Sequence, residues 1–235
     1  MTTKYKNKLM NYKILVYLIC LATLATSLYQ KQTLPDGFVY AKTVISDLDV
    51  ELRYYGINNF VGDTIDSYKS NTLIITKAAA EKLKLVQEEL QQQNLCLKIY
   101  DGYRPQGAVN HFIRWARDLN DTIHKSQFYP KVNKRDLFKA GYIASRSGHS
   151  RGSTIDLTLI NGNTGEPLDM GSPYDFFGKE SWVDYNDITE KQKANRQLLQ
   201  TVMLKHNFRN YSKEWWHFTL RWEPFPEIYF DFEVE

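Results

Sequence analysis

His149 and Asp156 have side-chain types and a spacing that could place them in one reactive site. His149 lies in a loop rich in Ser, Gly and Arg, directly before a β-branched segment that contains Asp156. Gly152, between them, gives the backbone the freedom to bring the imidazole near the carboxylate. Imidazole nitrogen and carboxylate oxygen are both zinc ligands, so the pair could supply two positions of a metal site. Taken alone, the pattern also fits a hydrogen-bonded loop histidine.

A second cluster, Glu214-Trp215-Trp216-His217, contains a potential base and another imidazole. Strict strand alternation would put Glu214 and His217 on opposite faces, so their convergence requires a twist, a bulge or a turn-like start. With that distortion, His149, Asp156 and His217 would hold zinc and leave a fourth position open to water. Glu214 could then accept that water's proton, which predicts metal-assisted hydrolysis. Without the distortion, the cluster is an ordinary amphipathic strand with a surface glutamate.

Three helices are expected around these residues. Thr76 can cap a helix that runs to about Gln93, and Thr189 opens a capping-box helix that ends near Asn207. Pro105 opens the remaining helix and places Arg104 at a strand-to-helix junction. That helix is expected to bury Ala108, Val109, Phe112, Trp115 and Leu119.

Strand-like segments alternate with these helices. They are expected at residues 95–100, 154–160, 214–222 and 228–234. In the second of these, alternation separates Asp156 from the apolar face, so Asp156 need not be buried in the apolar core. The mixture predicts an α+β fold, a single compact domain in which helices flank a mixed or mainly antiparallel sheet.

Charge and length exclude several classes of protein. The net charge is only +3 and basic residues are interspersed with acidic ones, which argues against a nucleic-acid partner. The five tryptophans are expected to pack in the core or the pocket wall. Cys96 lies in an apolar run and is expected to be a buried packing residue, not a nucleophile. The sequence leaves the oligomeric state open.

The N-terminus has the layout of a secretory signal, with four early lysines followed by an apolar run at residues 14–28. Ala25 and Ser27 are small residues at plausible cleavage positions, so residues 1–27 are expected to be a signal peptide and residues 28–235 the enzyme domain. The protein is therefore expected to be exported, either periplasmic or secreted. An uncleaved leader remains the alternative, and it would be the only membrane attachment.

Several motifs together resemble the VanX-type D-alanyl-D-alanine dipeptidases of peptidase family M15. The matching segments cover roughly residues 45–235 and include Asp101-Gly102-Tyr103-Arg104-Pro105, Ser147-Gly148-His149-Ser150-Arg151-Gly152, Ile155-Asp156-Leu157-Thr158-Leu159 and Glu214-Trp215-Trp216-His217. The resemblance implies a compact α+β fold shared with zinc D,D-peptidases and Hedgehog-like domains. It also implies one Zn²⁺ held by His149, Asp156 and His217.

The resemblance further assigns the reaction and the roles of the remaining residues. Glu214 would act as general base and then acid, and Arg104 would stabilise the developing oxyanion. Asp175 and Tyr54 would receive the free ammonium of the dipeptide, and Ser147 would be a further pocket residue. The implied reaction is hydrolysis of D-Ala-D-Ala, and an exported enzyme would serve cell-wall peptide turnover or salvage.

Two other functions remain compatible with this sequence. A D,D-carboxypeptidase would use the same zinc site to trim longer peptidoglycan peptides, although Asp175 and Tyr54 argue against it. A non-catalytic module that binds peptidoglycan fragments would need no Glu214. The preference between free and N-acylated substrate distinguishes the first from a dipeptidase, and turnover distinguishes the second.

Overall fold

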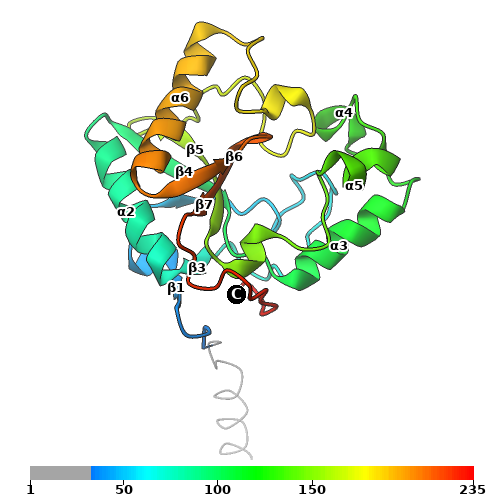
Figure 1. The fold of residues 1–235 in the computed structure, drawn as a ribbon, viewed down its shortest axis with the longest axis horizontal. Coiled ribbons are helices and arrows are strands. Elements are labelled where there is room, and N and C mark those ends of the chain that lie inside the picture. The colour runs from blue at the N-terminus through cyan, green and yellow to red at the C-terminus, as the bar shows by residue number, and fades with distance from the viewer. Residues whose placement is uncertain (1–32) are drawn as a thin grey trace, which may run out of the picture. The chain divides into compact units, whose positions relative to one another are not determined.

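A five-stranded mixed sheet forms the centre of residues 33–235, the part of the chain that this computed structural model describes (Figure 1). Residues 35–235 form one compact unit. The expected signal peptide and its cleavage point lie outside the described residues. Within those residues, no helix combines the length and the apolar character needed to cross a lipid bilayer.

The elements follow one another in an α+β order. The strands are β1 (Phe38–Tyr40), β2 (Asp49–Val50), β3 (Ile74–Thr76), β4 (Leu95–Asp101), β5 (Thr154–Asn161), β6 (Phe208–Tyr211) and β7 (Glu214–Leu220). The α-helices are α2 (Lys77–Gln91), α3 (Gln106–Arg117), α4 (Lys125–Phe128), α5 (Leu137–Ala140) and α6 (Glu190–Lys205). Short 3-10 turns are η1 (Ala41–Thr43), η2 (Lys134–Asp136), η3 (Gly148–Arg151) and η4 (Lys179–Ser181).

The central sheet has the strand order β2-β4-β5-β7-β6. Only β2 runs parallel to its neighbour, and the other pairs are antiparallel, as the sequence predicted. A small second sheet pairs β1 with β3. In Figure 1, α2 and α6 lie together on one side of the central sheet, whereas α3, α4 and α5 lie on the other side. The sheet therefore has both faces covered.

The predicted helix starts are confirmed by their caps. The Thr76 hydroxyl accepts a hydrogen bond from the backbone N–H of Ala79. Thr189 and Gln192 form the reciprocal capping box at the start of α6. Pro105 directly precedes α3. These local signals fixed the helices because each cap uses only side chains from the helix's own first turn.

The expected strand at 228–234 is absent from the structure. Val234 makes only an isolated bridge to Tyr68. The aromatic residues of this segment pack against Phe38 instead of forming a strand. The ring centroids of Phe230 and Phe232 lie 4.9 Å and 5.2 Å from the ring centroid of Phe38. Their alternation reflects aromatic packing and not a hydrogen-bonded ladder. A short strand that the sequence analysis missed, β6, pairs with β7.

Other expectations about burial also need correction. Leu119 is 40% exposed because α3 ends at Arg117 and the chain then turns extended at Asp118. Trp222, beyond the end of β7, is 74% exposed, and Trp182 is partly exposed, so neither packs in the core. Cys96 is half-buried, and burial raises the pKa of its thiol.

Asp156 is buried, but on the polar face of β5, where strand alternation separates it from the apolar side chains of that strand. Every residue of β5 up to Ile160 is buried, because both faces of this strand are covered. Alternation separates Asp156 from the apolar neighbours Ile155 and Leu157 but does not expose it to solvent. Its face of the sheet is the floor of the site described below.

Gly152 occupies a position that requires glycine. Its φ is +80°, and an added Cβ would lie 2.2 Å from Cε1 of Phe38. We expect Gly152→Ala to lower the free energy of unfolding by roughly 2–4 kcal/mol in urea denaturation, from left-handed strain and overpacking. Gly165→Ala is the matched control, because Gly165 has a φ of +73° but no atom within 4 Å. Equal losses for both variants would contradict the proposed clash.

Candidate active site

Three acidic and imidazole side chains lie in one row across the centre of the sheet. Asp101 on β4 is the register partner of Asp156 on β5, and Asp156 is the partner of His217 on β7. Directly paired residues on neighbouring strands project to the same face and lie close together. The strand pairing alone thus brings residues from three distant parts of the chain together.

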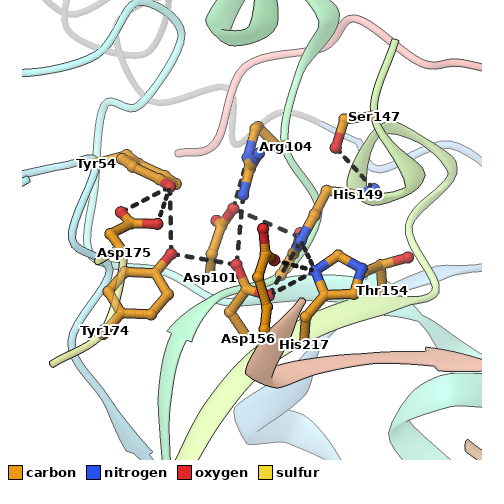
Figure 2. Close-up of polar contacts among 12 residues, drawn as sticks. Tyr54, Asp101, Arg104, Ser147, His149, Thr154, Asp156, Tyr174, Asp175 and His217 are labelled. Atoms are coloured by element: carbon orange, nitrogen blue, oxygen red, sulfur yellow. Dashed lines mark hydrogen bonds and ion pairs between the residues drawn. The ribbon is translucent and has the colours of Figure 1, made fainter. Parts of the chain in front are cut away.

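His149 completes the cluster from the turn η3. Its Nε2 lies 3.3 Å from Oδ1 of Asp156 and 3.3 Å from Nδ1 of His217. Nδ1 of His217 lies 3.0 Å from the same carboxylate oxygen. The three ligand atoms all lie within 4.8 Å of one another. Figure 2 shows these three side chains pointing toward one another. His149, Asp156 and His217 could therefore hold a metal ion, as the sequence predicted.

The donor set fits a metal ion by an observation of this structure. Oδ1 of Asp156 is buried and has no hydrogen-bond partner within the described residues. Its nearest polar neighbours are the two imidazole nitrogens, 3.3 and 3.0 Å away, and a cation bound between these three atoms would satisfy the carboxylate oxygen and both nitrogen lone pairs. Nδ1 of His149 lies 2.7 Å from the carbonyl oxygen of Gly102. Donation of its N–H to that carbonyl leaves the Nε2 lone pair free for a metal.

Glu214 reaches the cluster through a β-bulge. The pairing of β6 with β7 shifts register between Asn210 and Tyr211, so that Tyr211 opposes Glu214 while Asn210 opposes Phe218. This irregularity allows Oε2 of Glu214 to approach to 3.4 Å from Nδ1 of His217, despite their opposite faces in a regular strand. The distortion that the sequence required is present.

The pKa shifts of Glu214, His149 and Asp156 suit proton transfer and metal binding, whereas the pKa of His217 is raised. Burial would lower the pKa of His217, but the Asp156 carboxylate outweighs burial, so a metal ion would have to displace the proton of this imidazole. Burial raises the pKa of Glu214, although His217 opposes the shift, and a raised carboxyl pKa suits a general base near neutral pH. Burial lowers the pKa of His149, which favours the neutral imidazole that metals require. For Asp156, the two imidazoles outweigh burial and lower the pKa, so this carboxylate stays ionised.

Arg104 lies beside the cluster and is held rigidly. Its Nε donates to Oδ2 of Asp101 at 2.8 Å, and a terminal nitrogen lies 3.4 Å from Oδ2 of Asp156. The guanidinium also lies over the Tyr54 ring, 4.9 Å from its centroid. Burial would lower the pKa of Arg104, but Tyr54 and Asp101 outweigh it, so the group stays charged. A fixed cation here can stabilise negative charge that develops at the site.

Asp175 and Tyr54 meet on the opposite side of Arg104. The Tyr54 hydroxyl donates to Oδ2 of Asp175 at 2.9 Å, and both side chains are buried. Within the described residues, Asp175 forms no ion pair with a cation, and burial raises its pKa well above the usual value. The charge of Asp156 adds to that shift. A buried carboxyl without a cation is suited to receive one from a ligand.

Ser147 has a local role that the sequence analysis did not foresee. Its hydroxyl accepts a hydrogen bond of 3.3 Å from the backbone N–H of His149 and so caps η3. It also lines the cavity, whose volume is about 250 Å³. All eight predicted site residues line this one cavity: Tyr54, Arg104, Ser147, His149, Asp156, Asp175, Glu214 and His217. A space of that size suits a small ligand, not a polymer threaded through it.

The structure adds three residues that the sequence analysis did not assign to the site. Asp101 is fully buried and accepts a 2.6 Å hydrogen bond from the Tyr68 hydroxyl as well as the Arg104 contact. Asp101 is the last residue of the buried strand β4 and lies three residues before Arg104. This position could have marked it as a site residue from the sequence. Tyr174 contacts both Tyr54 and Asp156. No local pattern marks Tyr68 or Tyr174, because their partners are far away in the sequence.

Comparison with known proteins agrees with this geometry. Residues 35–235 match the family model described as D-ala-D-ala dipeptidase. The D-alanyl-D-alanine dipeptidase of Streptomyces coelicolor is 39% identical over 197 residues, which cover 84% of this chain and 98% of the relative. The enzyme of the same name from Enterococcus faecium is 39% identical over 199 residues, covering 85% and 98%. That of Escherichia coli is 30% identical over 177 residues, covering 75% and 81%. The chain therefore belongs to the D-ala-D-ala dipeptidase family, peptidase family M15.

Proposed function

We propose that this protein is a zinc-dependent dipeptidase that hydrolyses D-Ala-D-Ala to two molecules of D-alanine. The observation that supports it most is the convergence of His149, Asp156 and His217 on one buried carboxylate oxygen, beside a base and a fixed cation. Two imidazoles and one carboxylate suit an open tetrahedral zinc site. Zinc, when bound there, acts as a Lewis acid and makes water a stronger acid.

Glu214 is the general base in this proposal. Its carboxylate accepts a proton from the attacking water and later delivers it to the nitrogen of the leaving D-alanine. Its raised pKa and its place next to His217 support both transfers. Arg104 stabilises the oxyanion that forms at the scissile carbonyl, since Asp101 holds its guanidinium in place before the reaction begins.

Asp175 and Tyr54 bind the free ammonium of the dipeptide. An arriving ammonium supplies the cation that buried Asp175 lacks within the described residues, and Tyr54 keeps the carboxylate oriented. An acylated amine has no charge to offer and needs extra space in a small cavity. Ser147, the N-cap residue of η3, lines the same cavity and completes the proposed substrate contacts.

The test is release of D-alanine from D-Ala-D-Ala and from its N-acetyl derivative by the purified protein. We expect hydrolysis of the free dipeptide to require zinc, to cease after chelation and to return when zinc is restored. The acetylated substrate should show a kcat/KM at least about 100-fold lower, because it leaves the Asp175 carboxyl unpaired. Asp175→Asn should lose most of that preference.

Each contrary outcome identifies another function. Equal hydrolysis of both substrates would indicate a D,D-carboxypeptidase acting on longer peptidoglycan peptides. Zinc binding without hydrolysis of either substrate would indicate a non-catalytic module that binds peptidoglycan fragments. The first outcome would also remove Asp175 and Tyr54 from amine recognition.

The expected leader at residues 1–27 supports a location of this activity outside the cytoplasm. An exported enzyme meets dipeptide released from the cell wall, which supports a role in wall turnover or salvage. Fractionation of cells, with N-terminal sequencing of the mature protein, tests both export and cleavage. Recovery of the intact chain from the cytoplasm alone would contradict this location.

A further inference from the structure

The hydroxyl of Tyr174 lies at the junction between the two halves of the site. It is 3.2 Å from Oδ2 of Asp156 and 3.3 Å from the Tyr54 hydroxyl. Figure 2 shows both contacts as dashed lines. Tyr54 in turn contacts Asp175. Tyr174 thus connects the proposed ammonium subsite with the proposed metal ligand, and it is buried.

Counting protons assigns a direction to these contacts. A tyrosine hydroxyl has one proton to donate, and Tyr54 donates its proton to Asp175. Tyr174 therefore has its own proton to give to either of its two neighbours. The Asp156 carboxylate is the stronger acceptor because it is charged. Tyr174 donates to Oδ2 of Asp156.

This donation determines which oxygen of Asp156 faces the imidazoles. Oδ2 receives Tyr174 and, at 3.4 Å, Arg104. Oδ1 is left toward Nε2 of His149 and Nδ1 of His217, with no hydrogen bond within the described residues. Hydrogen bonds to the distal oxygen of a ligating carboxylate orient it and adjust its affinity for the metal.

The ring of Tyr174 is fixed independently of its hydroxyl. It stacks on Tyr100 with the centroids 4.7 Å apart and meets Trp216 edge to face at 5.3 Å. This packing holds the hydroxyl in place without help from Asp156. A phenylalanine at position 174 would keep the ring contacts and lose only the contacts of the hydroxyl with Asp156 and Tyr54.

We infer that Tyr174 is a positioning residue that sets the orientation of the metal-binding carboxylate of Asp156. The inference rests on the proposed function only in assigning Asp156 to the metal. Its test measures zinc binding without substrate, so that it stands apart from the test of dipeptide hydrolysis.

The experiment is a competition for zinc between the protein and a chromogenic chelator. We expect Tyr174→Phe to weaken zinc affinity about tenfold, the lower end of the range for groups that hydrogen-bond a metal ligand. Tyr129→Phe is the matched control. The Tyr129 hydroxyl is also buried but has no hydrogen-bond partner within the described residues, and it does not line the cavity. Its loss should leave zinc affinity unchanged.

A third variant, Tyr174→Leu, separates the hydroxyl from the ring. Equal weakening in Tyr174→Phe and Tyr174→Leu would support the hydrogen bond as the cause. Normal affinity in Tyr174→Phe, with weakening only in Tyr174→Leu, would assign the effect to packing and overturn the inference. Zinc binding by the unaltered protein without dipeptide hydrolysis would overturn the proposed function and leave the positioning role supported by the Phe and Leu results.

Discussion

Glu214→Gln is expected to lower kcat for D-Ala-D-Ala by about 10²- to 10⁴-fold while zinc remains bound, since a glutamine cannot accept the water's proton. The side chain keeps nearly the same shape beside His217, and none of the three proposed ligands changes. Steady-state kinetics and metal analysis of the same preparation measure the two quantities together. KM should change little, because Glu214 acts on the water and not on the ends of the dipeptide.

Glu166→Gln is the control for the change in charge. Glu166 is exposed, lies outside the cavity and should be replaced without loss of turnover. Unchanged turnover in Glu214→Gln would remove Glu214 from the proton transfer. Loss of zinc together with turnover would instead show that Glu214 supports the metal site.

Arg104→Lys is expected to lower kcat by about 10²- to 10³-fold, the usual effect of losing one group that stabilises the oxyanion. Lysine keeps the charge but cannot reproduce the planar guanidinium that Asp101 orients at 2.8 Å. A phosphinate analogue of the dipeptide, which resembles the tetrahedral state, should lose more affinity than the substrate does. Inhibition and steady-state kinetics measure that difference.

Arg114→Lys provides the matched control on α3, where Arg114 pairs with exposed Asp66 and lies outside the cavity. It should leave kcat and inhibitor affinity unchanged. Equal weakening of substrate and analogue by Arg104→Lys would show that Arg104 contributes only uniform binding. A thermal unfolding curve for each variant separates loss of catalysis from loss of fold.

Residue types and spacing indicated the three proposed ligands and Glu214, whereas the resemblance to the dipeptidase family assigned the remaining residues of the site, Arg104, Asp175, Tyr54 and Ser147. All eight residues predicted for the site line one cavity, although they come from five regions of the chain. The requirement for an irregular strand at Glu214 also followed from the sequence, since regular alternation separates it from His217. The identity of that irregularity did not follow, because the register shift belongs to the pairing of β6 with β7.

The helix starts could be predicted from the sequence, whereas contacts between residues far apart in the chain became visible only in the tertiary structure. The caps at Thr76 and Thr189 depend on neighbours within one helical turn, so their helices could be predicted. The segment 228–234 alternates like a strand but packs its rings against Phe38, far away in the sequence. Alternation reports which side of a segment is apolar and does not report whether a partner strand is available.

The same distinction explains the site. The sequence by itself determined the ligand types, the base and the helices that flank the sheet. Only the tertiary structure decided that Asp101, Asp156 and His217 align across three strands, and that Tyr174 connects Asp156 with Tyr54. These contacts join residues separated by many positions, and their geometry depends on strand register and packing that no local pattern specifies.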